Sequence, residues 1–101
     1  NDYYAEEAAN AIQANRNRPF FLYLSFAAVH TPLQATREDY DALSAIPDHT
    51  QRVYGAMVRS LDRGVGRVMQ ALRENGLDEN TSVIFVSDNG EHIDGCTALV
   101  A

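Results

Sequence analysis

The chain has 101 residues and a net charge of −6 at pH 7, with 46% hydrophobic and 22% charged residues. This composition indicates one globular domain or part of one. The acidic balance argues against a nucleic-acid-binding protein, which needs a basic surface, and no apolar run approaches the roughly 20 residues that span a membrane. No stretch resembles a signal peptide, so the sequence assigns no compartment.

The N-terminal third predicts a helix followed by a strand. Residues 2–15 fit a helix that Asp2 could cap and that Pro19 prevents from continuing. Residues 20–29, FFLYLSFAAV, are apolar at nearly every position, which predicts a strand buried on both faces. The apolar stripe of the helix consists of Ala5, Ala8, Ala9 and Ile12.

A loop over residues 30–36 leads to a short helix. Thr36 and Asp39 have the spacing of a capping box, with Asp in place of the usual Glu or Gln. We therefore expect a helix over about 37–45, which ends before Pro47.

Residues 49–75 predict the longest helix, because apolar residues recur there at steps of three and four. Gly76 has the place of a left-handed residue that ends a helix, and residues 81–87, TSVIFVS, predict a second buried strand. The apolar face of this helix consists of Val53, Met57, Val58, Leu61, Val65, Val68, Met69 and Leu72. Glycines 55, 64 and 66 interrupt the helix, which indicates close approach to a neighbouring backbone.

The order strand, loop, long helix, strand predicts an α/β fold built on a βαβ unit with parallel strands. The long helix would cover one face of the sheet, and the N-terminal helix the other. Ligands of such sheets collect beyond the carboxyl ends of the strands. His30 follows the first strand, and Asp88 and Asn89 follow the second, so the topology predicts that these three residues meet at one edge.

Two interpretations of this edge are open on the residues alone. Asp88 and Asn89 offer a carboxylate and a carbonyl oxygen, the ligands that Ca²⁺ and Mg²⁺ prefer, but Asp-Asn-Gly is equally suited to a turn that ends a strand. His30 could donate a hydrogen bond to an oxyanion, or it could be an ordinary loop histidine. We expect His49 near a helix start without a chemical role, His92 in a solvated loop, and Cys96 as a buried or inert thiol. For Asp62 and Arg63, in the middle of the long helix, we expect an ion pair at the surface or at an interface.

Two segments together resemble the sulfatase family of the alkaline-phosphatase-like superfamily. PFFLYLSFAAVHTPL, residues 19–33, is similar to the family's strand and its His-x-Pro loop. YGAMVRSLDRGVGRVMQALRENGLDENTSVIFVSDNG, residues 54–90, is similar to the family's long helix and the strand that ends in Ser-Asp-Asn-Gly. The resemblance implies that residues 1–101 are a partial sulfatase catalytic domain with an alkaline-phosphatase-like core.

The resemblance also implies roles for the candidate residues. Asp88 and Asn89 match two ligands of the family's divalent cation, usually Ca²⁺, and His30 matches the histidine that contacts the sulfate of a sulfate ester substrate. The implied activity is that of a sulfuric ester hydrolase.

Three parts of the family pattern are not matched. The family nucleophile is a formylglycine made from the cysteine of Cys-x-Pro/Ala-x-Arg, but Cys96 begins CTALVA, where Val100 stands at the arginine position. Cys96 is therefore not the nucleophile, and formylglycine is not available in this chain. An early pair of acidic metal ligands and a downstream lysine segment are also absent, so we expect no activity from this chain alone.

Two alternatives stay open. A phosphodiesterase or phosphonate hydrolase of the same superfamily commonly has Asp-His-Gly-Glu where this chain has Asp88-Asn89-Gly90-Glu91. A non-catalytic interaction module could instead bury an exposed sheet edge by forming a homo-oligomer.

Overall fold

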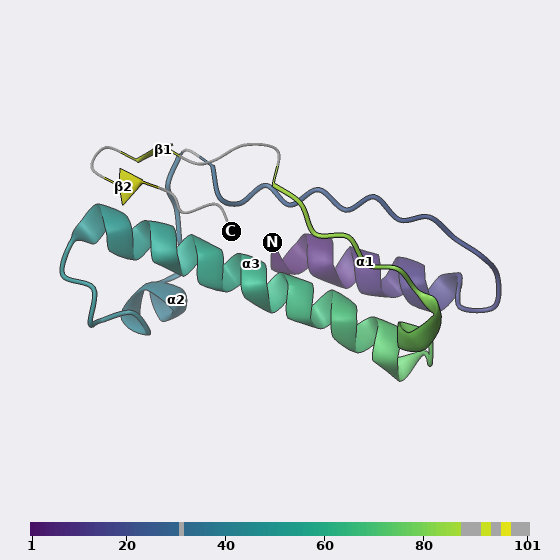
Figure 1. The fold of residues 1–101 in the computed structure, drawn as a ribbon. Helices are drawn as coiled ribbons and strands as arrows, with labels where there is room; N and C mark the ends of the chain where they lie inside the picture. The colour runs from purple at the N-terminus through teal and green to yellow at the C-terminus, as the bar shows by residue number, and fades with distance from the viewer. Residues whose placement is uncertain (31, 88–91, 94–95, 98–101) are drawn as a thin grey trace.

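The computed structural model describes residues 1–30, 32–87, 92–93 and 96–97, and this part of the chain is mainly helical (Figure 1). The longest helix runs the length of the molecule, and two extended segments accompany it. The helices are α1 (Asp2–Ala14), α2 (Arg37–Asp41) and α3 (His49–Glu74), followed by the 3₁₀ helix η1 (Asp78–Asn80). A short antiparallel pair, β1 (His92–Ile93) and β2 (Cys96–Thr97), places His92 opposite Thr97.

Helix α1 forms where the spacing of alanines predicts it, and its buried face consists of Ala5, Ala8, Ala9 and Ile12. These small side chains let α1 lie close to α3. The prediction that Asp2 caps this helix is wrong. Asn1 holds the cap position without a side-chain hydrogen bond, and Asp2 instead pairs with Arg63 of α3.

The Thr36 cap is confirmed at the start of α2. The Thr36 hydroxyl accepts a hydrogen bond from the backbone N–H of Asp39 at 3.2 Å and donates one to Asp39 Oδ2 at 2.9 Å. The helix ends at Asp41, several residues before the predicted end.

Helix α3 confirms the prediction for residues 49–75 to within one residue. Asp48 caps it by accepting a hydrogen bond from Gln51 N–H at 2.8 Å. At its other end Gly76 has φ +68°, a left-handed conformation that side chains rarely adopt. The next N–H, that of Leu77, donates to the carbonyl of Leu72 at 2.8 Å, which closes the helix and reverses the chain.

The core lies between α1 and the C-terminal half of α3. Its buried cluster contains Ala9, Ile12, Ala71 and Leu72, with Val68, Met69 and Leu77 partly buried around it. Ile12 is the largest apolar side chain that is almost fully buried, at 1% exposure. The two helices therefore bury their apolar faces against each other rather than against opposite faces of a sheet.

The predicted α/β fold, with its βαβ unit of parallel strands, is wrong for this structure. Residues 20–29 and 81–87 are extended, but neither segment is a strand, and no sheet joins them. Their side chains are also not buried, since Phe21 is 92% and Ile84 is 83% exposed. The physical reason is that a strand satisfies its backbone only through a neighbouring strand, and no backbone hydrogen bond between described residues involves 20–29 or 82–86.

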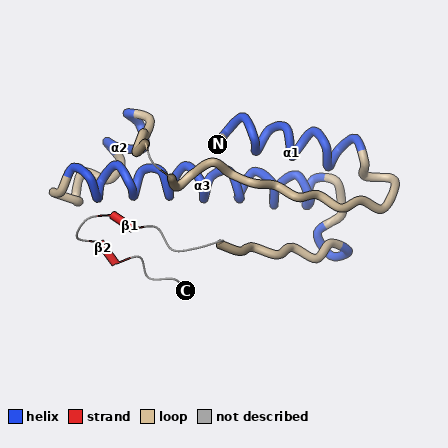
Figure 2. The backbone as a smooth tube through the Cα atoms, turned by 90° about the horizontal axis from the view of Figure 1, so that it is seen from above, coloured by secondary structure: helices blue, strands red, loops and turns tan. Residues whose placement is uncertain are grey.

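Figure 2 shows how the two extended segments lie relative to the helices. Both run opposite in direction to α3 (Figures 1 and 2), and Figure 2 shows residues 81–87 on the other side of α3 from α1. The radius of gyration is 15.5 Å, larger than the roughly 13 Å typical of a compact domain of this length. Among the described residues, no helix is both long and apolar enough to cross a membrane.

Candidate functional site

His30 directly follows the extended segment 20–29 and is an exposed residue. The segment begins at the loop after α1 and runs along α3 (Figures 1 and 2). A histidine at this position can present its imidazole to a ligand from solvent, and its ring can donate a hydrogen bond to an anion.

Asp88 and Asn89, the predicted metal ligands, lie outside the described residues. Their predicted meeting with His30 therefore stays a prediction. Within residues 1–30, 32–87, 92–93 and 96–97, no group of three or more His, Cys, Asp or Glu side chains could hold a metal ion. The chemistry of the donor set still fits a hard cation, because Asp and Asn supply oxygen ligands.

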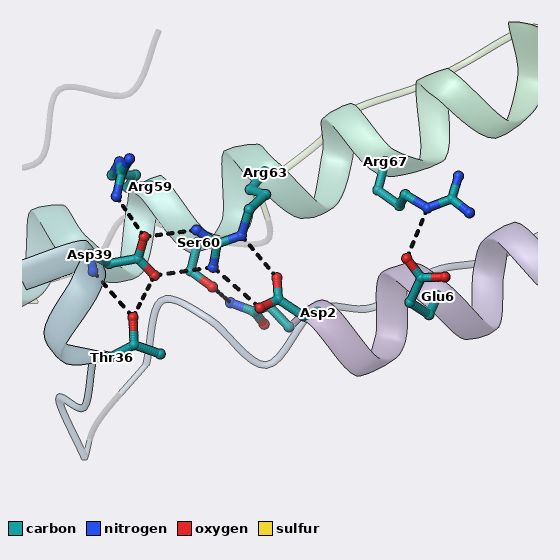
Figure 3. A network of polar contacts seen from close by, with 9 residues as sticks. Asp2, Glu6, Thr36, Asp39, Arg59, Ser60, Arg63 and Arg67 are labelled. Carbon is teal, nitrogen blue, oxygen red and sulfur yellow. Dashed lines mark hydrogen bonds and ion pairs between the residues drawn. The ribbon is translucent and has the colours of Figure 1, made fainter. Parts of the chain in front are cut away.

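The best-defined polar cluster surrounds Asp39, which is fully buried at 0% exposure (Figure 3). Arg63 donates to both of its carboxylate oxygens, from Nη1 at 2.7 Å and from Nη2 at 3.1 Å. Arg59 adds a third guanidinium contact at 2.9 Å. With the Thr36 hydroxyl, these donors fully occupy the carboxylate, which is the condition under which a buried charge is tolerated.

These contacts set the charge state of Asp39. Hydrogen bonds from Arg63 are the main reason that the pKa of Asp39 falls from its ordinary 3.8 to about 2, and they outweigh the opposing effect of burial. Hydrogen bonds with Asp39, and then with Asp2, in turn raise the pKa of the Arg63 guanidinium. Asp39 is therefore a permanently ionised structural group at neutral pH and not an acid or base of the kind that catalysis uses.

Arg63 connects three helices through this cluster. Its guanidinium also reaches Asp2 of α1, with Nε 3.1 Å from Oδ1 and Nη2 3.2 Å from Oδ2. One turn further along α3, Arg67 donates to Glu6 of α1 at 2.8 Å (Figure 3). The ion pair expected of Arg63 is present, and it lies at the junction of α1, α2 and α3.

An open groove of 590 Å³ lies between α2 and the start of α3. Within it the Tyr40 hydroxyl and His49 Nδ1 form a hydrogen bond of 2.8 Å, and the Arg52 guanidinium lies 3.8 Å above the Tyr40 ring. His49 is the first residue of α3, which confirms its predicted place near a helix start. The groove is lined by Leu33, Gln34, Ala35, Arg37, Tyr40, Asp41, His49 and Val53.

Sequence reasoning missed the Asp39 cluster. The capping-box spacing identified Asp39 only as a local cap residue. Its arginine partners are 20 and 24 residues further along the chain, a distance at which no periodic pattern links two residues. The one available signal was the repeat of arginines at positions 59, 63 and 67, which places them on one face of α3.

Comparisons with known proteins identify the family. The sulfatase family model matches residues 2–99. Steryl-sulfatase of Mus musculus is 44% identical over 94 residues, a match that covers 89% of this chain and 14% of that protein. N-acetylgalactosamine-6-sulfatase of Mus musculus is 37% identical over 89 residues, covering 86% of this chain and 16% of that protein.

A solved structure supports the same assignment. The crystal structure of Ps i-CgsB in complex with k-i-k-neocarrahexaose matches with a TM-score of 0.73 and 41% identity, over 75% of this chain and 17% of that one. The chain thus spans only 14% to 17% of the length of the proteins named here. The family match over nearly all described residues, together with these identities, shows that the chain belongs to the sulfatase family.

Proposed function

We propose that this chain is the part of a sulfuric ester hydrolase that contributes a sulfate-contacting histidine and two ligands of a divalent cation. The observation that supports the proposal is the sulfatase family match over residues 2–99. His30 would contact the sulfate, and Asp88 and Asn89 would be the metal ligands.

The chemistry of His30 suits this role. The residue is exposed at the end of an extended segment, and an imidazole N–H is a donor that a sulfate oxygen could accept from. Protonation of the ring would strengthen that hydrogen bond, because a charged donor binds an anionic acceptor more tightly. His30 would thus orient the ester and balance part of its charge.

Asp88 and Asn89 would hold Ca²⁺ or Mg²⁺ through one carboxylate and one amide oxygen. When bound, the cation would supply Lewis-acid polarisation of the sulfate ester. Two protein oxygens are fewer than the six to eight that Ca²⁺ typically takes. We therefore expect the chain to bind the cation only weakly by itself.

Titrations followed by NMR test both roles on the chain itself. Sulfate should shift the ring resonances of His30 in a saturable way, and Ca²⁺ should shift the backbone resonances of Asp88 and Asn89. Asp88→Ala should abolish the Ca²⁺ response, whereas Asp62→Ala, at an exposed position of α3, should leave it intact. Saturation of the Ca²⁺ shifts in Asp88→Ala would contradict the metal assignment.

Hydrolysis provides a separate test. Since Cys96 lacks the sequence context of a formylglycine precursor, the chain should not hydrolyse an aryl sulfate such as 4-nitrophenyl sulfate. Turnover that is lost in Asp88→Ala would show instead that the chain is catalytically complete.

We also propose that the chain self-associates. Among the described residues there is no sheet edge of the predicted kind, but the extended segment Val83–Val86 exposes four consecutive large apolar side chains. Its backbone makes no backbone hydrogen bond with other described residues. An extended, apolar and uncharged segment of this kind pairs readily with a copy of itself.

A further inference from the structure

The segment that carries His30 is attached to α3 at two points, one on each side of the histidine. Phe26 forms the first attachment and Thr36, with Asp39, forms the second. The contacts of both attachments on α3 fall within residues 59–64, which span less than two turns. The segment between Phe26 and Thr36 is thus attached at both ends to the same short stretch of α3.

The attachment before His30 depends on Gly64. A Cβ placed on Gly64 would lie 3.0 Å from Cε1 of Phe26 and 3.7 Å from Cβ of Ala5. The absence of a side chain therefore lets the Phe26 ring edge reach the helix beside α1. Phe26 is partly buried, whereas Phe21 and Tyr23 of the same segment are 92% and 81% exposed. Phe26 is thus an anchor of an otherwise exposed segment.

The attachment after His30 is electrostatic. Thr36 and Asp39 are joined by two reciprocal hydrogen bonds, and Asp39 is held by Arg59 and by both terminal nitrogens of Arg63 (Figure 3). Arg63 and Gly64 are adjacent in α3. The apolar contact therefore fixes one end of the segment between Phe26 and Thr36, and the ionic contact fixes the other. This segment, the tether, contains only nine residues.

We propose that Gly64 and Asp39 are positioning residues, which hold the His30 segment on α3 in the place from which His30 meets sulfate. This inference rests on the proposed function of His30. A tether fixed at both ends samples fewer conformations than one fixed at a single end, and a binding group needs such support to keep its geometry. Loss of either attachment would leave α3 intact and would loosen the segment that carries His30.

Two glycines two residues apart provide a matched comparison. Gly64→Ala introduces a methyl group against Phe26, whereas Gly66→Ala introduces the same methyl group where no atom lies within 4 Å. Both changes add the same helix propensity. NMR relaxation of the backbone amides of residues 27–30 and 33–35 should show increased ps–ns mobility in Gly64→Ala and wild-type values in Gly66→Ala.

The ionic attachment is tested in the same way. Asp39→Asn keeps the size of the side chain but removes the charge that Arg59 and Arg63 bind, and Asp41→Asn makes the same change at an exposed position. Mobility of residues 33–35 should rise in Asp39→Asn and stay unchanged in Asp41→Asn. Phe26→Ala removes the first attachment without altering α3, so it tests the proposal even where Gly64→Ala does not fold.

Sulfate titration gives the readout that helix stability alone would not change. The apparent affinity measured at the His30 ring should fall by about threefold to tenfold in Gly64→Ala, while the amide protection of α3 stays as in the wild type. Phe26→Leu combined with Gly64→Ala should restore part of this affinity, because the smaller side chain leaves room for the methyl group.

The two proposals fail in different ways. If wild-type His30 does not respond to sulfate, its proposed function is wrong, and the mobility comparison still decides whether the segment is held at two points. Unchanged mobility in folded Gly64→Ala, or in Phe26→Ala, would overturn the positioning role.

Discussion

The helical part of the molecule and its two extended segments differ in how their backbone is hydrogen-bonded and in how far their apolar side chains are buried. Helices α1 and α3 satisfy their backbone internally and bury their apolar faces against each other, so they are complete within this chain. Residues 20–29 and 81–87 are at least as apolar, yet they have no strand beside them and expose most of their large side chains. Apolar composition alone therefore does not bury a segment, because an extended backbone also needs a partner.

The largest expected effect is on the free energy of unfolding. It is tested by comparing substitutions at two isoleucines, Ile12 in the helical part and Ile84 in an extended segment. Ile12→Ala should lower the free energy of unfolding by about 3 kcal/mol, because it leaves a cavity in the core. Ile84→Ala should change it by less than about 0.5 kcal/mol, because the side chain is 83% exposed. Urea denaturation followed by circular dichroism measures both. Equal losses would show that residues 81–87 are packed and that the comparison is wrong.

A smaller effect comes from the buried carboxylate. Since the pKa of Asp39 is lowered from 3.8 to about 2, its ionised form stabilises the fold above pH 4, and this contribution is lost as the pH falls from 4 towards 2. The loss should amount to about 2 kcal/mol. Denaturation curves at pH 6, 4, 3 and 2 measure it. Asp39→Asn should be less stable at neutral pH and should lack this part of the pH dependence.

The extended segment should affect association more than folding. Ile84→Lys places a charge within the exposed stretch Val83–Val86 and should weaken self-association about tenfold, equivalent to about 1.4 kcal/mol. Light scattering coupled to size-exclusion chromatography, over a range of concentrations, measures the change. Val58→Lys, at an exposed position of α3, serves as the control. A wild-type chain that stays monomeric at all concentrations would contradict the proposed self-association.

The smallest effect is expected at an exposed ion pair of the helical part. Glu6→Gln removes the charge that Arg67 binds at 2.8 Å, but the Glu6 side chain is 57% exposed. The change should cost about 0.5 kcal/mol or less and should shrink further at 1 M salt. Urea denaturation at low and high salt checks this. A cost near that of Ile12→Ala would mean that charge, and not burial, holds α1 against α3.

The sequence predicted the parts of the fold that depend on local physics. The spacing of apolar residues located α1 and α3, the Thr36 cap located α2, and Gly76 located the end of α3. Each of these signals acts within about one helical turn. They could be recognised because the hydrogen bonds of a helix join residues that are four apart.

The strands and the ionic cluster could not be predicted in this way. Whether residues 81–87 become a strand depends on which backbone lies beside them, and their own side chains do not determine that. The contact between Phe26 and Gly64 likewise joins residues 38 apart. The expected close approach at glycines 55, 64 and 66 is partly wrong, since the neighbours are side chains and Gly66 has none within 4 Å.

The candidate site was predicted mainly from the family resemblance. The residues alone favoured a turn at Asp88 and Asn89 over a metal site, and the family resemblance reversed that order. The comparisons establish the family, and the ligand and sulfate-contact assignments remain predictions for the titrations described above.

The position of Arg63 has a consequence for the order in which the chain folds during synthesis. Residue 39 leaves the ribosome before residue 63, and Asp2 leaves earlier still. Neither carboxylate can reach its guanidinium partner until most of α3 has been made, since the ion pairs join residues 24 and 61 apart. The ionic contacts that join α1 and α2 to α3 can therefore form only after the arginines of α3 have been made.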